Sequence, residues 1–454
     1  MLKRTWMAIV AVALAAAFVP AVAATAAPKA PPGALTVAVY GDSPYGNTPY
    51  APGAPSSPPD NHWQRDQSPA FIDTINQDSS VSEVIHVGDI HSGKQACTSD
   101  YDTDVAALWT AFQKPLVYTP GDNEWTDCHK ATSLAKPGEF GGFFASSAAF
   151  TGIKYLAADG LTTDPSTDPC FDYSCGNPTD NLSLVRSLFF AHPGQTLGSG
   201  TLSVTSQHDA YDPAHPTDAQ YVENVMWAQR DVVFVTINVP GGSNNDADPW
   251  YAIPATDNPA WSPALTSQVD ALRTAQTTER ANRTAADIRW LDAAFALANA
   301  NHAKGVVITA QADMWDLDGK AAAHLTNYEP IISDIAAQTT AFKRPVLMFN
   351  GDSHLYRSDN PMQQTAGCDG ENDPATGLSV CAHDPGNSAW SSHAGLNLDV
   401  PNFHRVVVHG DNYDPVLPLE WLELTVDPDA NNKTTATSFG PFSWQRMPQP
   451  QLDP

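Results

Sequence analysis

Positive charge is scarce in this sequence. Lysine and arginine together number 23, against 50 aspartate and glutamate residues, which gives a formal net charge of −27. A field of this sign repels nucleic acid and anionic membranes at long range, so we expect neither as a partner. The same charge suits solubility outside the cytoplasm, or the collection of cations.

Long apolar runs are also scarce. The run from 7 to 19 is shorter than the ~20 residues that a membrane-spanning helix needs. It follows Lys3 and Arg4 and leads into small residues through Ala27. A basic start, a short apolar core and small residues at the exit are typical of a secretory signal peptide. We therefore expect residues 1–27 to be removed on export, a secreted or periplasmic location, and no membrane attachment afterwards.

Cysteine pairs of the Cys-x-x-Cys type are absent, which argues against a zinc site. The six cysteines are an even number, and in an exported chain an even number favours disulfides. Proximity in the sequence suggests the pairs Cys97–Cys128, Cys170–Cys175 and Cys368–Cys381. The other connectivities of six cysteines stay open.

Hydrophobic residues make up 42% of the chain, which predicts a folded core rather than disorder. Residues 28–34 are a linker of proline and alanine, and we expect one domain over 35–454. Short apolar runs rich in β-branched residues predict strands buried on both faces. These runs are 35–40, 84–87, 115–118, 232–237, 305–309 and 345–349.

Helical patterns lie between these runs, so the fold class is α/β. The expected helices are 70–76, 104–112, 275–301 and 331–340. The tail differs, because strand patterns at 404–408, 421–426 and 434–438 follow one another without helices, and we expect them to complete a second sheet. Residues near 130–220 and 242–274 are rich in Pro, Gly, Asp and Ser, and we expect long loop insertions over the site there.

Four expected strands place an aspartate directly after their carboxyl end: Asp42, Asp89, Asp122 and Asp352. Ligands of α/β sheets bind beyond these ends. Carboxylates that converge at one edge repel one another unless something neutralises them, and a bound metal ion is the simplest neutraliser. Carboxylate oxygens suit Mg, Mn, Ca or iron, and His354 adds a nitrogen ligand.

The ordered motifs resemble those of the calcineurin-like metallophosphoesterases, nearest the purple acid phosphatases and their bacterial relatives. The motifs are Gly41-Asp42, Gly88-Asp89, Gly121-Asp-Asn-Glu124, Gln311 and Gly351-Asp-Ser-His354. The resemblance implies an αββα sandwich, in which two mixed sheets pack face to face with helices outside. It also implies two divalent metal ions and hydrolysis of a small phosphorylated substrate.

The resemblance also assigns roles to individual residues. Asp42 and His354 would bind the first metal, Asp89 would bridge both metals, and Asp122 would bind the second. Asn123 takes the place of the histidine that steadies the transition state in the family.

Several positions depart from the family pattern. Gln311 and Asp352 stand where the family has metal-binding histidines, so the amide oxygen and the carboxylate would make the second site rich in oxygen. Such a site favours Mn, Mg, Ca or Fe over zinc. Ser92 stands at the position of the tyrosine that colours purple acid phosphatases, and Tyr45 is an alternative to it.

A poor leaving group needs a proton donor, and Asn123 cannot serve as one. His91 and His129, close to two of the motifs, are the candidates. The altered motifs leave a second hypothesis open, a binding protein of this fold without catalysis. A third is a serine hydrolase with Ser43 as nucleophile, for which Asp212 and His215 offer the only Asp-x-x-His spacing. Oligomeric state does not follow from the sequence.

Overall fold

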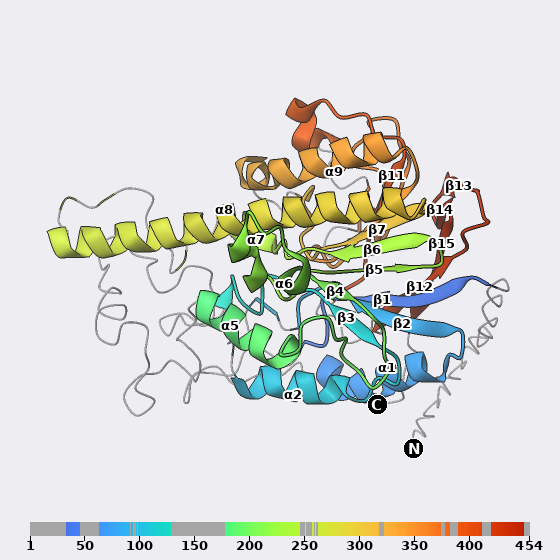
Figure 1. Ribbon diagram of the computed structural model, residues 1–454, viewed down its shortest axis with the longest axis horizontal. Coiled ribbons are helices and arrows are strands. Elements are labelled where there is room, and N and C mark those ends of the chain that lie inside the picture. Colours follow the sequence, from blue (N-terminus) through green and yellow to red (C-terminus); the bar gives the residue numbers. More distant parts are fainter. Residues whose placement is uncertain are drawn as a thin grey trace, which may run out of the picture.

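Two β-sheets pack face to face, with helices on both outer faces (Figure 1). The computed structural model describes residues 33–45, 63–90, 92–93, 97, 99–128, 178–245, 250, 257, 259, 262–316, 322–373, 377–381, 389–410 and 419–448. Each sheet contains both parallel and antiparallel pairs. The architecture is therefore an αββα sandwich of two mixed sheets.

The first sheet has seven strands in the order β13-β14-β15-β12-β1-β2-β3. β1, β2 and β3 run parallel, and β12 pairs antiparallel with β1. The bounds are β1 Leu35–Tyr40, β2 Val81–His86, β3 Leu116–Tyr118, β12 Glu420–Val426, β13 Asn432–Thr435, β14 Ser438–Gly440 and β15 Phe442–Pro448.

The second sheet has eight strands in the order β10-β9-β11-β8-β7-β6-β5-β4. Its central strands β6, β7, β8 and β11 are parallel. The bounds are β4 Thr205–Ser206, β5 Val225–Gln229, β6 Val232–Thr236, β7 Gly305–Thr309, β8 Val346–Asn350, β9 Arg357–Asp359, β10 Cys368–Gly370 and β11 Phe403–Val407.

Helices α1, α2 and α5 cover the first sheet, whereas α8 and α9 cover the second (Figure 1). The helices are α1 Trp63–Gln77, α2 Ser99–Trp109, α5 Pro178–Phe189, α6 Gln207–Ala210, α7 Gly241–Asn245, α8 Pro263–Ala300 and α9 Glu329–Phe342. Short 3₁₀ helices are η2 Pro216–Gln220, η4 Ala322–Tyr328 and η5 Ala389–Leu396.

Strand β1 shows why the apolar runs lack alternation. Val37 and Val39 point into the core between the sheets, whereas Ala38 and Tyr40 pack against the helices below. Both faces of the strand are buried, so both sets of side chains are apolar. The prediction of doubly buried strands is confirmed here.

The distribution of strands between the sheets differs from the expectation. The runs that end before Asp42, Asp89 and Asp122 belong to the first sheet, whereas those before Gln311 and Asp352 belong to the second. The acidic turns thus meet across two sheets rather than along one edge. β12 to β15 pair onto β1 and complete the first sheet, and of the expected tail strands β11 alone joins the second.

Two stretches expected to be loops are partly helical. Within 130–220, α5 packs Val185 and Phe189 against the first sheet. The prediction for 242–274 missed the first turns of α8, which begins at Pro263. These turns project beyond the sheets (Figure 1), so little core packing marks them in the sequence. The expected signal peptide lies outside the described residues, as does the pair Cys170–Cys175.

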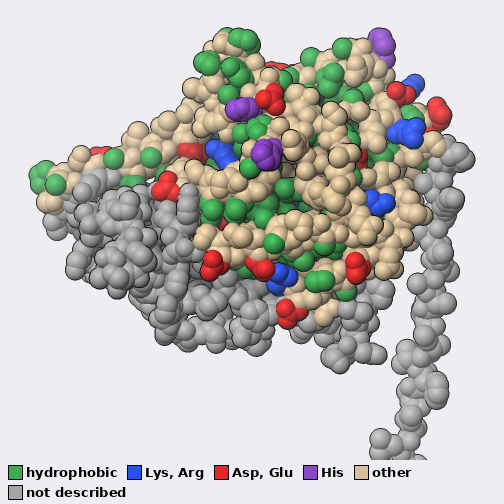
Figure 2. All heavy atoms as spheres, turned by 60° about the horizontal axis from the view of Figure 1, so that its bottom comes forward, with side chains coloured by type: hydrophobic (Ala, Val, Ile, Leu, Met, Phe, Trp, Pro, Cys, Tyr) green, Lys and Arg blue, Asp and Glu red, His purple; other side chains and the backbone are tan. Residues whose placement is uncertain are grey.

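The surface matches the acidic composition. On the face drawn in Figure 2, charged side chains of both signs lie scattered, and no basic patch is seen among the described residues. Within the same part of the chain, no helix combines the length and the apolar character needed to cross a bilayer.

Candidate metal centre

The candidate ligands lie in tight turns at the carboxyl ends of parallel strands. Asp42 follows β1, Asp89 follows β2, and Asp352 and His354 follow β8. All four have left-handed backbones, with φ of 47°, 60°, 75° and 62° in that order. Residues other than glycine rarely adopt this conformation, and such strain collects at functional sites.

Glycine precedes the aspartates because neighbouring turns press on one another. A Cβ on Gly121 would lie 1.8 Å from Asp89 Oδ1, and a Cβ on Gly351 would lie 2.3 Å from Asp42 Oδ2. Each glycine therefore makes room for the carboxylate of a neighbouring motif. The repeated Gly-Asp pattern reflects this packing as well as the turn.

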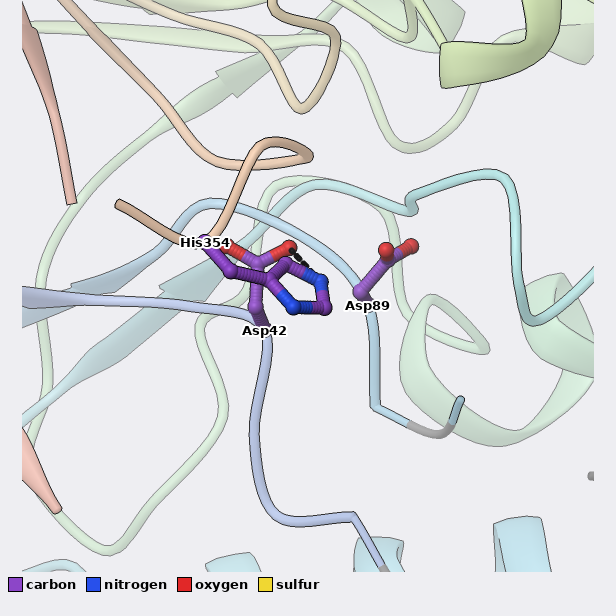
Figure 3. A group of neighbouring side chains, drawn as sticks. All are labelled: Asp42, Asp89 and His354. Carbon is purple, nitrogen blue, oxygen red and sulfur yellow. Dashed lines mark ion pairs between the residues drawn. The ribbon is translucent and has the colours of Figure 1, made fainter. Parts of the chain in front are cut away.

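Asp42, Asp89 and His354 form one group (Figure 3). Each offers a ligand atom, and the three atoms lie within 4.8 Å of one another. His354 Nε2 is 3.7 Å from Asp42 Oδ1. Asp42 is fully buried, and its Oδ2 accepts no hydrogen bond. The group thus combines two buried carboxylates and one imidazole, a set of donors that fits a divalent cation.

Burial makes the charged forms of these carboxylates costly. It raises the pKa of Asp42 to about 7, against the opposing effect of the Asp352 N–H that donates to Oδ1. The pKa of Asp89 rises well above its ordinary range through burial and the negative charges of Asp122 and Glu124. The pocket therefore favours a positive charge or protons beside these oxygens.

Asp122 lies beside Asp89, and Gln311 joins them. Gln311 Nε2 donates to Asp89 Oδ2 at 3.1 Å and to Asp122 Oδ1 at 3.0 Å. The amide oxygen faces away and accepts the N–H of Gly241 at 2.6 Å. The sequence predicted that this oxygen would be a metal ligand. The orientation differs because the oxygen accepts the Gly241 N–H instead.

Asp352 closes the ring of acidic residues. Its N–H donates to Asp42, and its Oδ2 accepts the N–H of Asp313 at 3.0 Å. A Cβ on Gly241 would lie 2.6 Å from both Asp352 Oδ1 and Asp122 Oδ2. The backbone of Gly241 therefore lies directly against both carboxylates.

Asn123 and Tyr45 line the same group. Asn123 Nδ2 donates to Asp89 Oδ2 at 2.8 Å and lies 3.5 Å from the hydroxyl of Tyr45. That hydroxyl is 3.1 Å from His354 Nε2. Tyr45, the alternative to Ser92, thus reaches the candidate ligands.

Two further residues border the site without having been assigned a role from the sequence. Glu124 Oε1 accepts the N–H groups of Asp89 and Gly121, at 3.2 and 2.6 Å, and so joins the turns after β2 and β3. His409 follows β11, and its electrostatic interaction with Asp42 lowers the pKa of that carboxyl. The strand-end rule applied to β11 would have identified His409.

The disulfide Cys97–Cys128 reinforces the same turns. Its Cα atoms are 5.5 Å apart, and both sulfurs lie close to the carbonyl oxygen of Asn123. Cys368–Cys381 is also formed, so two of the three expected pairs are confirmed. His91 and His129, the expected proton donors, lie outside the described residues.

A groove of about 770 Å³ lies elsewhere, between α5 and α8. Leu182, Arg186, Tyr221 and Ala275 are among the residues that line it, and the candidate ligands are not. The candidate metal site is therefore identified by its converging acidic side chains and not by the volume of a cavity.

No protein-family model matches the chain, and a search of curated proteins finds no match. Among solved structures, a dimetal phosphatase from Danio rerio aligns over 92% of this chain and 99% of its own, at 11% identity and a TM-score of 0.36. A purple acid phosphatase from seeds of yellow lupin (Lupinus luteus) aligns over 92% of this chain and 52% of its own, at 10% identity and a TM-score of 0.35.

Proposed function

We propose that this chain is a metal-dependent phosphoesterase of the calcineurin-like type, which hydrolyses small phosphate esters outside the cytoplasm. One observation supports it most: Asp42, Asp89 and His354 bring a ligand atom each within 4.8 Å. These residues come from turns that are 47 or more positions apart in the sequence, so local structure alone does not explain their meeting. The left-handed backbone of all three adds independent support.

The donor set fits a hard divalent cation. Asp42 and Asp89 supply oxygen and His354 supplies nitrogen, which suits Mn, Mg or Fe better than the nitrogen- and sulfur-rich sites of zinc. The unpartnered Oδ2 of Asp42 is a buried acceptor for which the protein supplies no donor. When bound, a divalent cation supplies a water of lowered pKa and positive charge for the phosphoryl oxygens.

The protein's own groups position the ester. Asn123 donates to Asp89 and to the Tyr45 hydroxyl, and we expect the second contact, 3.5 Å long, to give way to a phosphoryl oxygen. The Tyr45 hydroxyl lies 3.1 Å from His354 Nε2 and so helps to orient that ring. His91 and His129 stay the candidates for protonating the leaving group, as the sequence predicts.

The charge of the pocket favours one class of ester. Four aspartates, Asp42, Asp89, Asp122 and Asp352, surround the site. Their negative charge repels a phosphomonoester dianion more strongly than a phosphodiester monoanion. We therefore expect diesters or small activated esters to be turned over faster than monoesters.

Export agrees with the observed cross-links. Disulfides persist in oxidising compartments, and Cys97–Cys128 and Cys368–Cys381 are both formed. Removal of residues 1–27 during secretion is part of the proposal.

A binding protein without catalysis is a second candidate, supported by Gln311 and Asn123, which place amides where the family has histidines. The serine hydrolase is less well supported. The histidine that contacts Ser43 is His86, which reaches the backbone carbonyl at 2.6 Å and whose pKa burial lowers to about 3.

Turnover of chromogenic phosphate mono- and diesters tests the proposal. Protein treated with chelator should be inactive, and added Mn²⁺ or Mg²⁺ should restore activity. Asp89→Asn should lose at least about 100-fold in turnover, since weaker changes around metal ligands already cost 10–100-fold. Glu83→Gln, a buried carboxyl between the sheets, is the matched control and should keep full activity. Full activity in Asp89→Asn, or inhibition by a serine-directed phosphonate, contradicts the proposal.

A further inference from the structure

The Gln311 side chain joins Asp89 and Asp122, the two carboxylates to which the resemblance assigns a second cation. It is fully buried, and both N–H bonds of its amide are used by carboxylates, one by Asp89 and one by Asp122. An amide nitrogen has no free lone pair with which to coordinate a metal. The two carboxylates are thus joined by hydrogen-bond donors of the protein itself.

The orientation of this amide is determined by its other end. Gly241 N–H donates to Gln311 Oε1 at 2.6 Å. If the amide were reversed, its NH₂ would face the Gly241 N–H, donor against donor, and its oxygen would face two carboxylates. Both contacts would then be repulsive, so the orientation has no favourable alternative.

Gly241 in turn is held by an uncommon piece of backbone. In α7, Gly242, Ser243 and Asn244 have φ/ψ close to 60°/40°, and Asn245 has φ 68°. These angles describe one turn of a left-handed helix, which costs roughly 1–2 kcal/mol for each residue other than glycine. Such a turn persists only where its surroundings hold it.

Helix α8 supplies that support. Arg283, fully buried, donates to Asn238 O at 2.8 Å and to Asn244 Oδ1 at 2.6 Å, one residue before α7 and one within it. Glu279 pairs with Arg283 at 2.8 Å and accepts the Asn245 amide at 2.6 Å. Hydrogen bonds therefore connect Arg283 to the left-handed turn of α7, and the Gly241 N–H connects that turn to the Gln311 amide.

We infer that the Gln311 amide replaces a second metal ion, so that the chain binds a single divalent cation through Asp42, Asp89 and His354. The inference rests on the proposed function for the first cation and departs from the two ions that the resemblance implies. Gln311 stabilises the charges of Asp89 and Asp122 by donating to Asp89 Oδ2 and Asp122 Oδ1, the oxygens that would otherwise face a second cation.

Metal stoichiometry with Mn²⁺ alone as the probe tests this. Stripped wild-type protein should saturate at one Mn²⁺ per chain in equilibrium dialysis, with the electron paramagnetic resonance spectrum of an isolated ion. Gln311→His, which removes the donors and adds a nitrogen lone pair, should take up two ions and give a spin-coupled spectrum. Gln113→His, at an exposed position after α2, is the control for an added histidine and should behave like wild type.

Two ions in the wild type, no ion at all, or one ion in a folded Gln311→His each overturn the inference. Gln311→Glu is a second variant in case Gln311→His fails to fold. Its thermal stability should fall without metal and recover only at the second equivalent of Mn²⁺, whereas wild type should respond to the first alone. Ester turnover is measured separately, so an inactive protein with one ion contradicts the proposed function and leaves this inference standing.

Discussion

Two neighbouring halves of one pocket differ in the hydrogen-bond donors that they supply to their buried carboxylates. In the His354 half, formed by Asp42, Asp89 and His354, the Oδ2 atom of Asp42 has no donor. In the Gln311 half, formed by Asp89, Asp122 and Gln311, an amide donates to both acids. The same residue type in the same pocket thus has an unpartnered buried oxygen on one side and amide donors on the other.

Glu83 supplies a third case. It lies between the two sheets, where it accepts the indole N–H of Trp227 at 3.2 Å, and burial raises its pKa to about 7. With one neutral donor, this carboxyl keeps a proton up to about pH 7 instead. The cation of the proposed function, the Gln311 amide and the proton on Glu83 are thus three ways of stabilising a buried acid, and each can be tested by removing it.

The largest expected effect removes the support of the Gln311 half. Arg283→Met leaves Glu279 without its partner and releases the left-handed turn, and breaking a buried ion pair typically costs about 3–5 kcal/mol. Arg65→Met is the control, because Arg65 pairs with Asp104, which is 56% exposed, and we expect about 1 kcal/mol or less there. Urea unfolding measures both, and equal losses would contradict the assigned role of Arg283.

The next effect separates the halves by their affinity for Mn²⁺. Asp42→Asn removes a charged ligand and should weaken binding about 100-fold, or about 2.7 kcal/mol. Asp122→Asn alters an acid that already accepts a hydrogen bond from Gln311, and it should change the affinity less than about 10-fold, or about 1.4 kcal/mol. Titration calorimetry measures the Mn²⁺ affinity of both variants. Comparable losses of affinity would mean that the two halves do not differ in cation binding.

Glu83→Gln tests the proton. The pKa of Glu83 is raised from 4.5 to about 7 in the folded protein, so its contribution to stability is fully present below pH 4.5 and lost as pH rises through 7. Glutamine keeps an acceptor for Trp227 and never ionises. The variant should exceed wild type by about 1–3 kcal/mol at pH 8 and match it near pH 4. Urea unfolding across this range measures the difference, and one that does not depend on pH would refute the assignment.

The smallest expected effect concerns the His354 half. Tyr45→Phe removes the hydroxyl that lies 3.1 Å from His354 Nε2. Losing one hydrogen bond of this kind costs about 1 kcal/mol, so we expect roughly a 5-fold fall in turnover. Mn²⁺ stoichiometry should stay the same. A loss as large as that of Asp89→Asn would instead make Tyr45 a direct ligand.

Strand runs and strand-end acids were predictable because their causes are local. β1 and β7 have the predicted bounds, since an apolar run without polar interruption has no other stable place than a doubly buried strand. Asp42, Asp89 and His354 were found from their position after such strands. The glycine before each of two aspartates proves to serve a neighbouring turn, a reason that no single motif displays.

Other features depend on contacts that are distant in the sequence. The direction of the Gln311 amide depends on Gly241, 70 positions earlier. The first turns of α8 extend past the sheets, and their apolar spacing at Leu265, Val269 and Leu272 is too short to stand out from a stretch rich in Pro, Asp and Ser. The division of the strands between two sheets follows from long-range pairing such as β1 with β12, which composition does not encode.

The turn α7 has a consequence in terms of chirality. Its residues from 242 to 245 follow the mirror image of the path that L-residues prefer, so D-residues would fit it without strain. In protein assembled by chemical ligation, D-serine at Ser243 should be accepted where L-valine would not be. The left-handed turn holds the Gly241 N–H against the amide oxygen of Gln311. It thereby directs the amide NH₂ towards Asp89 and Asp122.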